Sequence, residues 1–285
     1  MTNNSVSSRP VEAEGYSVST FRLRRRTPGT FVLVPFPKGG RSIRCQGQLE
    51  GAAAVILANC PLVELIHEQP FQIRYAWRET PLGPEIRLLD QHNAARPAVP
   101  WRCSYIVPDF LVRMASGITR LIEVKPFDKL PKPDVQRKLS VARCFAEQNG
   151  WSFHVLTERE LRRDPLLGNL RLLSRYRRLM TDAEICERIL TLVAEQPTSI
   201  SDVCVRVRFP DRLHEVRAAV LHLVVTGRLD IDPRYEPISD STFLQPGGSI
   251  LWEPFDSVWG PSGSRTVEPF ASFDNSVPIN SPSST

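Results

Sequence analysis

The sequence lacks any long hydrophobic run. No stretch of about 18 consecutive apolar residues occurs, which argues against a transmembrane helix. The first ten residues, MTNNSVSSRP, are polar and do not contain the apolar core of a secretory signal peptide. We therefore expect a cytoplasmic protein. Its 285 residues, 41% of them hydrophobic, are enough for one good core and a second, smaller one.

Closely spaced cysteine pairs are also absent. The six cysteines form no CxxC pattern and lie far apart, at Cys45, Cys60, Cys103, Cys144, Cys186 and Cys204. Structural zinc sites usually take their ligands from such pairs, so the sequence argues against zinc. We expect reduced, buried thiols instead.

Acidic residues are in the minority, and the excess of positive charge is uneven. The net charge is +5, but residues 246–285 carry a net −3, which leaves +8 for the rest of the chain. A basic body favours a polyanionic partner such as DNA. The first 40 residues contain Arg22, Arg24 and Arg26, and we expect a basic arm there that either grips phosphates or stays a solvated leader.

The most informative stretch is residues 105–125, YIVPDFLVRMASGITRLIEVK. Two short apolar runs flank residues 115–117, a pattern typical of a β-hairpin with a three-residue loop. Centring the loop on Ser116 places Asp109 opposite Glu123, with α-carbons roughly 5 Å apart. The sequence therefore predicts two facing carboxylates.

Lys125 joins this pair, because side chains alternate along a strand and Glu123 and Lys125 share a face about 7 Å apart. Opposed carboxylates repel unless one takes up a proton or a divalent cation lies between them. Mg²⁺ suits such hard oxygen ligands, and Lys125 could hold or deprotonate an attacking water. These residues indicate phosphodiester hydrolysis. The alternative is a turn at Pro108-Asp109 and a solvated Glu/Lys pair.

Five short motifs follow one another along the chain, and their order is more specific than any one of them alone. They are Gln48-Leu49-Glu50, Gln69-Pro70, Pro108-Asp109-Phe110, Glu123-Val124-Lys125-Pro126 and Phe153-His154-Val155-Leu156-Thr157-Glu158. Pro108-Asp109 with Glu123-Val124-Lys125 resembles the signature of PD-(D/E)xK nucleases. Over residues 41–160 the chain resembles, more narrowly, the TnsA-like endonuclease subunit of heteromeric transposases, although that family often has Gln where Glu123 stands.

The resemblance implies an α/β, restriction-endonuclease-like N-terminal domain that cuts the 5′ ends of a transposon. It implies Mg²⁺, with Mn²⁺ as a substitute, bound by Asp109, Glu123 and a glutamate of the first helix. The helical stripe over residues 46–59 makes Glu50 the matching position, with Glu64 and Glu68 as competitors. Lys125 then activates water. Double-stranded transposon-end DNA, a DDE-type transposase and an AAA+ ATPase regulator are the implied partners.

Around these motifs we expect strands near residues 63–76, a long hairpin or extension over 78–104, a helix from about 134 to 148 and a parallel strand at 151–156. Three lysines close in sequence to Lys125 could track DNA phosphates, although scattered lysines are usually only solvated: Lys129, Lys132 and Lys138. His67 and His154 are expected to be structural, and His92 to lie in an exposed loop.

The C-terminal half divides into three parts. We expect a basic connector helix at residues 161–180, then a winged-helix-like domain at 181–245 that docks either DNA or protein. The tail, residues 246–285, is rich in Ser, Pro and Gly and is predicted to be disordered, with aromatic anchors for a partner such as the ATPase. A terminal strand covering the protein's own surface is the alternative. A stand-alone PD-(D/E)xK nuclease and a non-catalytic DNA-binding adaptor remain as rival functions.

Overall fold

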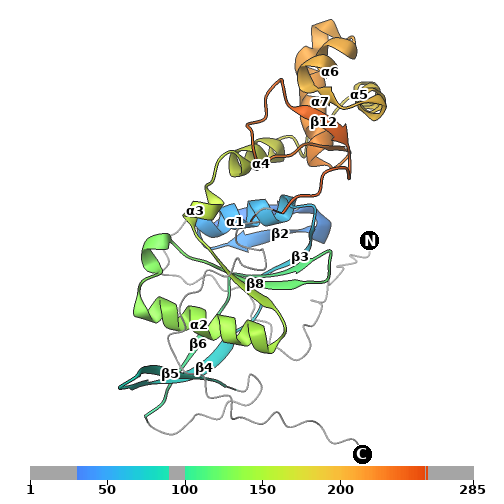
Figure 1. Ribbon diagram of the computed structural model, residues 1–285. Coiled ribbons are helices and arrows are strands. Elements are labelled where there is room, and N and C mark those ends of the chain that lie inside the picture. The colour runs from blue at the N-terminus through green and yellow to red at the C-terminus, as the bar shows by residue number, and fades with distance from the viewer. Residues whose placement is uncertain (1–30, 90–99, 254, 256–285) are drawn as a thin grey trace, which may run out of the picture.

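The computed structural model describes residues 31–89, 100–253 and 255 (Figure 1). Its centre is a four-stranded sheet of order β3-β7-β8-β9. The strands are β3 (Val63–Glu68), β7 (Phe110–Met114), β8 (Thr119–Val124) and β9 (Ser152–Leu156). β7 pairs antiparallel with both β3 and β8, and β9 pairs with β8 in parallel. The parallel pair is the one that a strand, helix, strand order predicts.

The β7–β8 hairpin has the predicted register. Phe110 pairs with Ile122 and Arg113 with Thr119, so the same register places Asp109 opposite Glu123. The loop closes through the Met114 amide, which donates to the Ile118 carbonyl, and Gly117 takes a φ of +84°. A side chain would strain that left-handed backbone, which explains glycine at this position.

Both faces of this sheet are covered, because its strands alternate between two apolar sets. Val112 and Ile122 face α1 (Gln48–Asn59), whereas Leu111 and Leu121 face α2 (Pro133–Gln148). α1 lies close to the neighbouring hairpin: a Cβ on Gly51 would stand 2.9 Å from Val32 Cγ1. Glycine is what permits this approach.

That hairpin corrects the prediction of a basic arm over residues 1–40. β1 (Val32–Phe36) and β2 (Arg41–Cys45) form an antiparallel pair whose inward side chains, among them Val34 and Ile43, join the core. The nuclease-like unit therefore begins before residue 41, because the hairpin crosses that boundary. The arginines at positions 22, 24 and 26 lie outside the described residues.

A second sheet lies beyond α2, of order β5-β4-β6. Its strands are β4 (Ile73–Thr80), β5 (Gly83–Leu88) and β6 (Arg102–Ile106). The predicted long hairpin is present as β4–β5, and β6 adds a strand that the sequence did not separate from β7. Phe71, Phe145 and Trp151 cluster between α2 and this sheet, with ring centroids 5.4–6.1 Å apart.

The connector differs from the predicted single helix. It contains α3 (Glu158–Leu161) and α4 (Leu166–Ser174), separated at Pro165. Proline lacks the amide hydrogen that an uninterrupted helix needs and fixes its own φ, so the chain restarts there. The leucines of α4 are buried, and α4 lies between α1 and the C-terminal helices (Figure 1).

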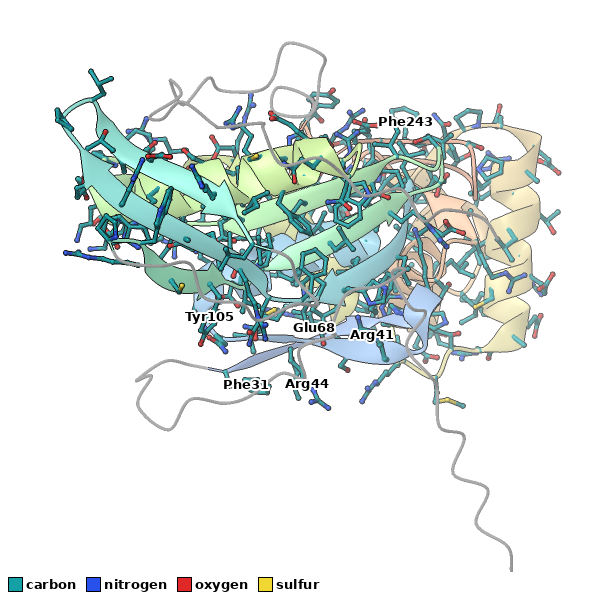
Figure 2. The ribbon with its side chains drawn as sticks, turned by 90° about the horizontal axis from the view of Figure 1, so that it is seen from below. Phe31, Arg41, Arg44, Glu68, Tyr105 and Phe243 are labelled. Carbon is teal, nitrogen blue, oxygen red and sulfur yellow. The ribbon has the colours of Figure 1, made fainter. Side chains whose placement is uncertain are left out.

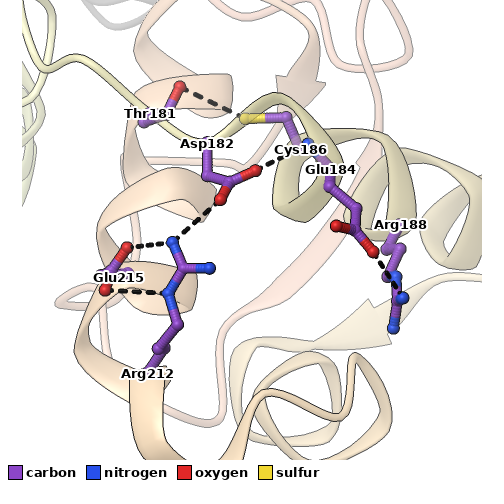
Figure 3. Close-up of polar contacts among 7 residues, drawn as sticks. All are labelled: Thr181, Asp182, Glu184, Cys186, Arg188, Arg212 and Glu215. Atoms are coloured by element: carbon purple, nitrogen blue, oxygen red, sulfur yellow. Dashed lines mark hydrogen bonds and ion pairs between the residues drawn. The ribbon is translucent and has the colours of Figure 1, made fainter.

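The C-terminal unit contains three helices, α5 (Ala183–Glu195), α6 (Ile200–Arg206) and α7 (Leu213–Val225). Its short strands β10 (Thr198–Ser199), β11 (Leu229–Asp230) and β12 (Phe243–Pro246) form a sheet of order β10-β12-β11. Arg212 ties the starts of α7 and α5 together, because it binds Glu215 and Asp182 at 2.5 and 2.9 Å (Figure 3).

The tail prediction is corrected in its first part. Trp252 and Phe255 are only 6% and 3% exposed and belong to the core cluster that runs through both units. The alternative correctly placed these residues on the protein's own surface, but it expected a strand, and residues 250–253 form no helix or strand. Trp259, Phe270 and Phe273 lie outside the described residues. Within the described segments, no helix is long and apolar enough to cross a membrane.

Candidate active site

The candidate site lies where β7 begins and β8 ends. Asp109 immediately precedes β7, and its backbone carbonyl accepts a hydrogen bond from the Gln69 amide at 2.9 Å. Its carboxylate accepts another from the amide of Val124 at 2.7 Å, across the hairpin. Two neighbouring strands thus fix both the backbone and the side chain of Asp109.

Glu123 and Lys125 meet Asp109 as the register predicted. Lys125 Nζ is 2.6 Å from Glu123 Oε1 and 3.6 Å from Asp109 Oδ2. The two carboxylate side chains are only 11–13% exposed. The other oxygen of Glu123, Oε2, is buried and has no hydrogen-bond partner among the described residues. Such an orphaned carboxylate oxygen is expensive unless a proton or a cation reaches it.

Glu50 completes the group from the first turn of α1. Its Oε2 accepts a hydrogen bond from the Gln46 amide at 2.8 Å, which binds the carboxylate to the start of the helix. Its charge interacts with Asp109 and Lys125. The competitors are engaged elsewhere: Glu64 pairs with Arg113 at 3.0 Å and Glu68 with Arg41 at 2.7 Å.

The pairing of Glu68 is visible in Figure 2, where Arg41 and Glu68 lie together beside the β1–β2 hairpin. Arg41 also donates to the Ile66 carbonyl, so it is tied to β3 twice. Of the three glutamates weighed from the sequence, Glu50 is the one whose charge is coupled to the Asp109–Lys125 pair.

Three carboxyl groups are buried close together in this site, and their pKa values are raised as a result. Burial, followed by repulsion from Asp109, raises the pKa of Glu50 to about 7 and that of Glu123 to about 8. Burial also raises the pKa of Asp109, against the attraction of Lys125. Burial alone would lower the pKa of Lys125, but Asp109 and Glu123 outweigh it and raise that pKa. One ammonium therefore faces three carboxyl groups.

Such a group can bind a hard cation once its protons leave. The orphaned Glu123 Oε2 and the raised carboxyl pKa values both fit a divalent ion. Within the described residues, however, no three His, Cys, Asp or Glu side chains are assembled as a ready metal site. Lys125 Nζ stands between Asp109 and Glu123 and supplies positive charge there.

The other lysines and the histidines named from the sequence lie outside this carboxylate group or beyond the described residues. Lys129, Lys132 and Lys138 are all exposed, after β8 and along the start of α2. His154 is buried and contacts Ser152 at 3.0 Å, and burial lowers the pKa of the half-buried His67. His92 lies outside the described residues.

The thiol prediction holds in part. No disulfide joins any of the six cysteines, and Cys45, Cys60 and Cys186 are buried, but Cys103 is exposed. Cys45 ends β2 beside the site, where burial, followed by repulsion from the nearby carboxylates, raises its pKa to about 12.

Glu158 ends the last sequence motif, but the sequence indicated no role for it. Its carboxylate accepts a hydrogen bond from the Phe127 amide at 2.9 Å and so fixes the turn that follows Lys125. The neighbouring capping box, in which Thr157 and Glu160 exchange hydrogen bonds, is readable as a Thr-x-x-Glu pattern and could have located this helix start.

Comparison with known families bears on the part of the chain that holds this site. Residues 60–158 match the family model of the TnsA-like endonuclease N-terminal domain. This part of the chain is thus similar to TnsA-like endonucleases. No curated protein matches the chain. The matched span contains Asp109, Glu123 and Lys125, whereas Glu50 lies before it.

The TnsA-like match supports a nuclease subunit of a transposase in general terms. The mixed α/β architecture, with helices on both faces of a mixed sheet, agrees with a restriction-endonuclease-like domain.

Proposed function

We propose that this protein is a Mg²⁺-dependent DNA endonuclease subunit of a heteromeric transposase, which hydrolyses phosphodiester bonds at the 5′ ends of a transposon. The observation that carries the proposal is the convergence of Asp109, Glu123 and Lys125 inside the TnsA-like domain. Their order, on the two strands of one hairpin, is also that of the PD-(D/E)xK signature.

Asp109, Glu123 and Glu50 would hold the ion, with Mn²⁺ able to replace Mg²⁺. A bound divalent ion supplies Lewis-acid stabilisation of the charge that builds on the phosphate during hydrolysis. The chain contributes rigidity: Asp109 is held by the Val124 amide and Glu50 by the Gln46 amide. Fixed ligands lose little freedom when they bind.

Lys125 acts on the attacking water or on a phosphate oxygen. In its charged form, which Asp109 and Glu123 favour, it donates hydrogen bonds and can orient either group. It acts as a base only after it loses that proton. Lys129, Lys132 and Lys138, exposed just beyond it, would contact DNA phosphates.

The C-terminal unit would provide assembly. Its order, α5, β10, α6, α7, β11, β12, with β12 paired between β10 and β11, supports a winged-helix domain over residues 181–245. We assign to it, or to the residues after it, the contacts with a DDE-type transposase and an AAA+ regulator. DNA binding by this unit is the competing role.

The test is strand-mapped cleavage of DNA carrying the element's ends, with Mg²⁺, with and without the neighbouring transposase. Nicks at the 5′ ends that require the transposase and disappear with Asp109→Ala support the proposal. Cleavage without the transposase would indicate a stand-alone nuclease. No cleavage in either case, with Asp109→Ala still supporting transposition in cells, would leave a non-catalytic adaptor.

A further inference from the structure

The α3–α4 connector combines a buried leucine side with an exposed arginine side. Four leucines of α4 are 2–8% exposed: Leu166, Leu167, Leu170 and Leu173. Five arginines point outward, and we call them the arginine ridge: Arg162, Arg163, Arg171, Arg175 and Arg178. From residue 165 to residue 181 the chain contains no Asp or Glu. The connector therefore presents concentrated positive charge.

The arginine ridge forms no ion pairs with the residues that the structure describes. Across the part of the chain that the structure describes, none of its five side chains forms an ion pair, whereas arginines elsewhere do. Arg113 pairs with Glu64 at 3.0 Å and Arg188 with Glu184 at 2.6 Å. Like charges so close together repel, and within the described chain only the charge of Glu158, which interacts with Arg162, is set against them.

Two other arginines of the same segment have structural roles. Arg177 donates to Asn59 Oδ1 at 2.9 Å, and Arg159 stacks on the Phe127 ring with its guanidinium carbon 3.2 Å from the centroid. Both fasten the connector to the nuclease-like unit. Within the described ranges, no side-chain hydrogen bond or ring contact of this kind involves the five residues of the arginine ridge.

The connector is held firmly, so the arginine ridge has a fixed place. Asn169, only 5% exposed, donates to the carbonyls of Pro233 and Glu236 and accepts from the Ile238 amide. These three bonds fix α4 to the C-terminal unit. Arg171 and Arg175 lie four residues apart, which places them on one side of the helix, about 6 Å from each other.

The connector that carries the arginine ridge begins beside the candidate site. The Lys125 amide donates to the Leu156 carbonyl at the end of β9, and Glu158, at the start of α3, receives the Phe127 amide. From there the connector runs over α1 to the C-terminal helices (Figure 1). The connector that carries the arginine ridge thus links the candidate site to the second unit.

We propose that the arginine ridge binds the phosphate backbone of double-stranded DNA and holds the duplex against both units. Arginine forms bidentate hydrogen bonds with phosphate, and unpaired exposed guanidiniums are the groups that release counterions on binding DNA. The proposal takes DNA as the polyanion from the proposed function, but it does not depend on cleavage.

The experiment measures binding of the full chain to a labelled duplex in EDTA, across a series of salt concentrations, so that no strand is cut. Arg171→Gln/Arg175→Gln removes two charges of the arginine ridge. Arg113→Gln/Arg188→Gln is the matched control, because it removes two ion-paired charges. Arg171→Lys/Arg175→Lys keeps the charge. Thermal unfolding of each variant checks that it is folded.

Loss of two phosphate contacts reduces the slope of log affinity against log salt by about 1.8, so the affinity ratio between 50 and 200 mM salt shrinks about 10-fold. The control and the lysine variant keep the slope. An unchanged slope in the glutamine variant overturns the proposal, as does an equal loss in the control. Unchanged DNA binding with loss of binding to the transposase would instead assign the arginine ridge to an acidic protein surface. Cleavage in Mg²⁺, measured separately, tests the proposed function.

Discussion

Glu123 is the residue whose environment departs most from that of an ordinary surface glutamate. Burial first, and Asp109 second, raise its pKa from 4.5 to about 8, and one of its oxygens has no partner in the described structure. In the metal-free protein at neutral pH, this carboxyl group therefore holds a proton. A divalent ion would have to displace that proton, so ion binding and proton release are linked.

This linkage predicts how stability depends on pH. Between about pH 4.5 and pH 8 the folded protein keeps a proton on Glu123 that the unfolded chain has released. The free energy of unfolding therefore falls as pH rises through this window. Glu123→Gln removes the effect, so in EDTA we expect its melting temperature to exceed that of the wild type by an amount that grows from pH 5 to pH 8.

The measurement is thermal unfolding in EDTA at several pH values, where about 1 kcal/mol corresponds to roughly 2–4 °C. Glu64→Gln, at an exposed ion-paired position, is the control and should follow the wild type. A Glu123→Gln curve parallel to that of the wild type across this range would contradict the raised pKa.

At the scale of secondary-structure elements, the hairpins differ in whether nearby residues or distant packing determine them. The β7–β8 register was predictable because a three-residue loop with Gly117 fixes it within a few residues of sequence. The β1–β2 hairpin was not, because Pro35, Gly39 and Gly40 resemble the punctuation of a loop. What makes it a hairpin is a distant surface, the α1 side of the core, that receives Val34 and Ile43.

The choice of Glu50 among three glutamates has the same physical reason. Glu50 lies on α1, and Glu64 and Glu68 both lie on β3. The packing of α1 against the sheet decides which of the three faces Asp109. Arg41 and Arg113, which engage the two competitors, come from strands distant in the sequence. Long-range packing is therefore the information that a local pattern does not contain.

Substitution of two helical glycines by alanine should change the stability of the protein in opposite directions. Gly51 in α1 contacts β1, and a Cβ there would stand 2.9 Å from Val32, whereas Gly168 in α4 has no atom within 4 Å of that position. Gly51→Ala should destabilise the protein by about 1–3 kcal/mol through overpacking. Gly168→Ala should stabilise it by roughly 0.5–1 kcal/mol, because alanine loses less backbone entropy in a helix.

Chemical denaturation measures both changes in the same buffer. The sign of each change is the decisive result. Stabilisation by Gly51→Ala would show that α1 and β1 are not in close contact.

One hydrophobic cluster joins the nuclease-like unit to the C-terminal unit. The cluster that begins at Val34 continues through α1 and α4 to α7 and ends at Phe255. Trp252 is the clearest bridge: it is 6% exposed, and its carbonyl accepts from the Cys60 thiol at 3.3 Å, across 192 residues of sequence. Composition predicted a disordered tail here, since no sequence pattern reveals a surface so far away along the chain.

Trp252→Ala should therefore cost about 3–5 kcal/mol of stability through loss of buried area and an unfilled cavity. Leu251→Ala, next to it but 64% exposed, should change stability by about 0.5 kcal/mol or less. Denaturant unfolding monitored by circular dichroism measures both. Equal, small effects would show that the segment is not packed on the core.

The central claim is that the buried carboxylates of the TnsA-like domain hydrolyse DNA, and an isosteric substitution tests it most directly. The measurement is the single-turnover rate of 5′-end cleavage in Mg²⁺, with the transposase present, for Glu123→Gln against Glu64→Gln. Loss of a residue that supports a metal ligand typically costs 10–100-fold, so loss of a ligand itself should exceed about 100-fold. We expect that loss for Glu123→Gln and a rate within about twofold of wild type for Glu64→Gln. Wild-type cleavage by folded Glu123→Gln would contradict the account.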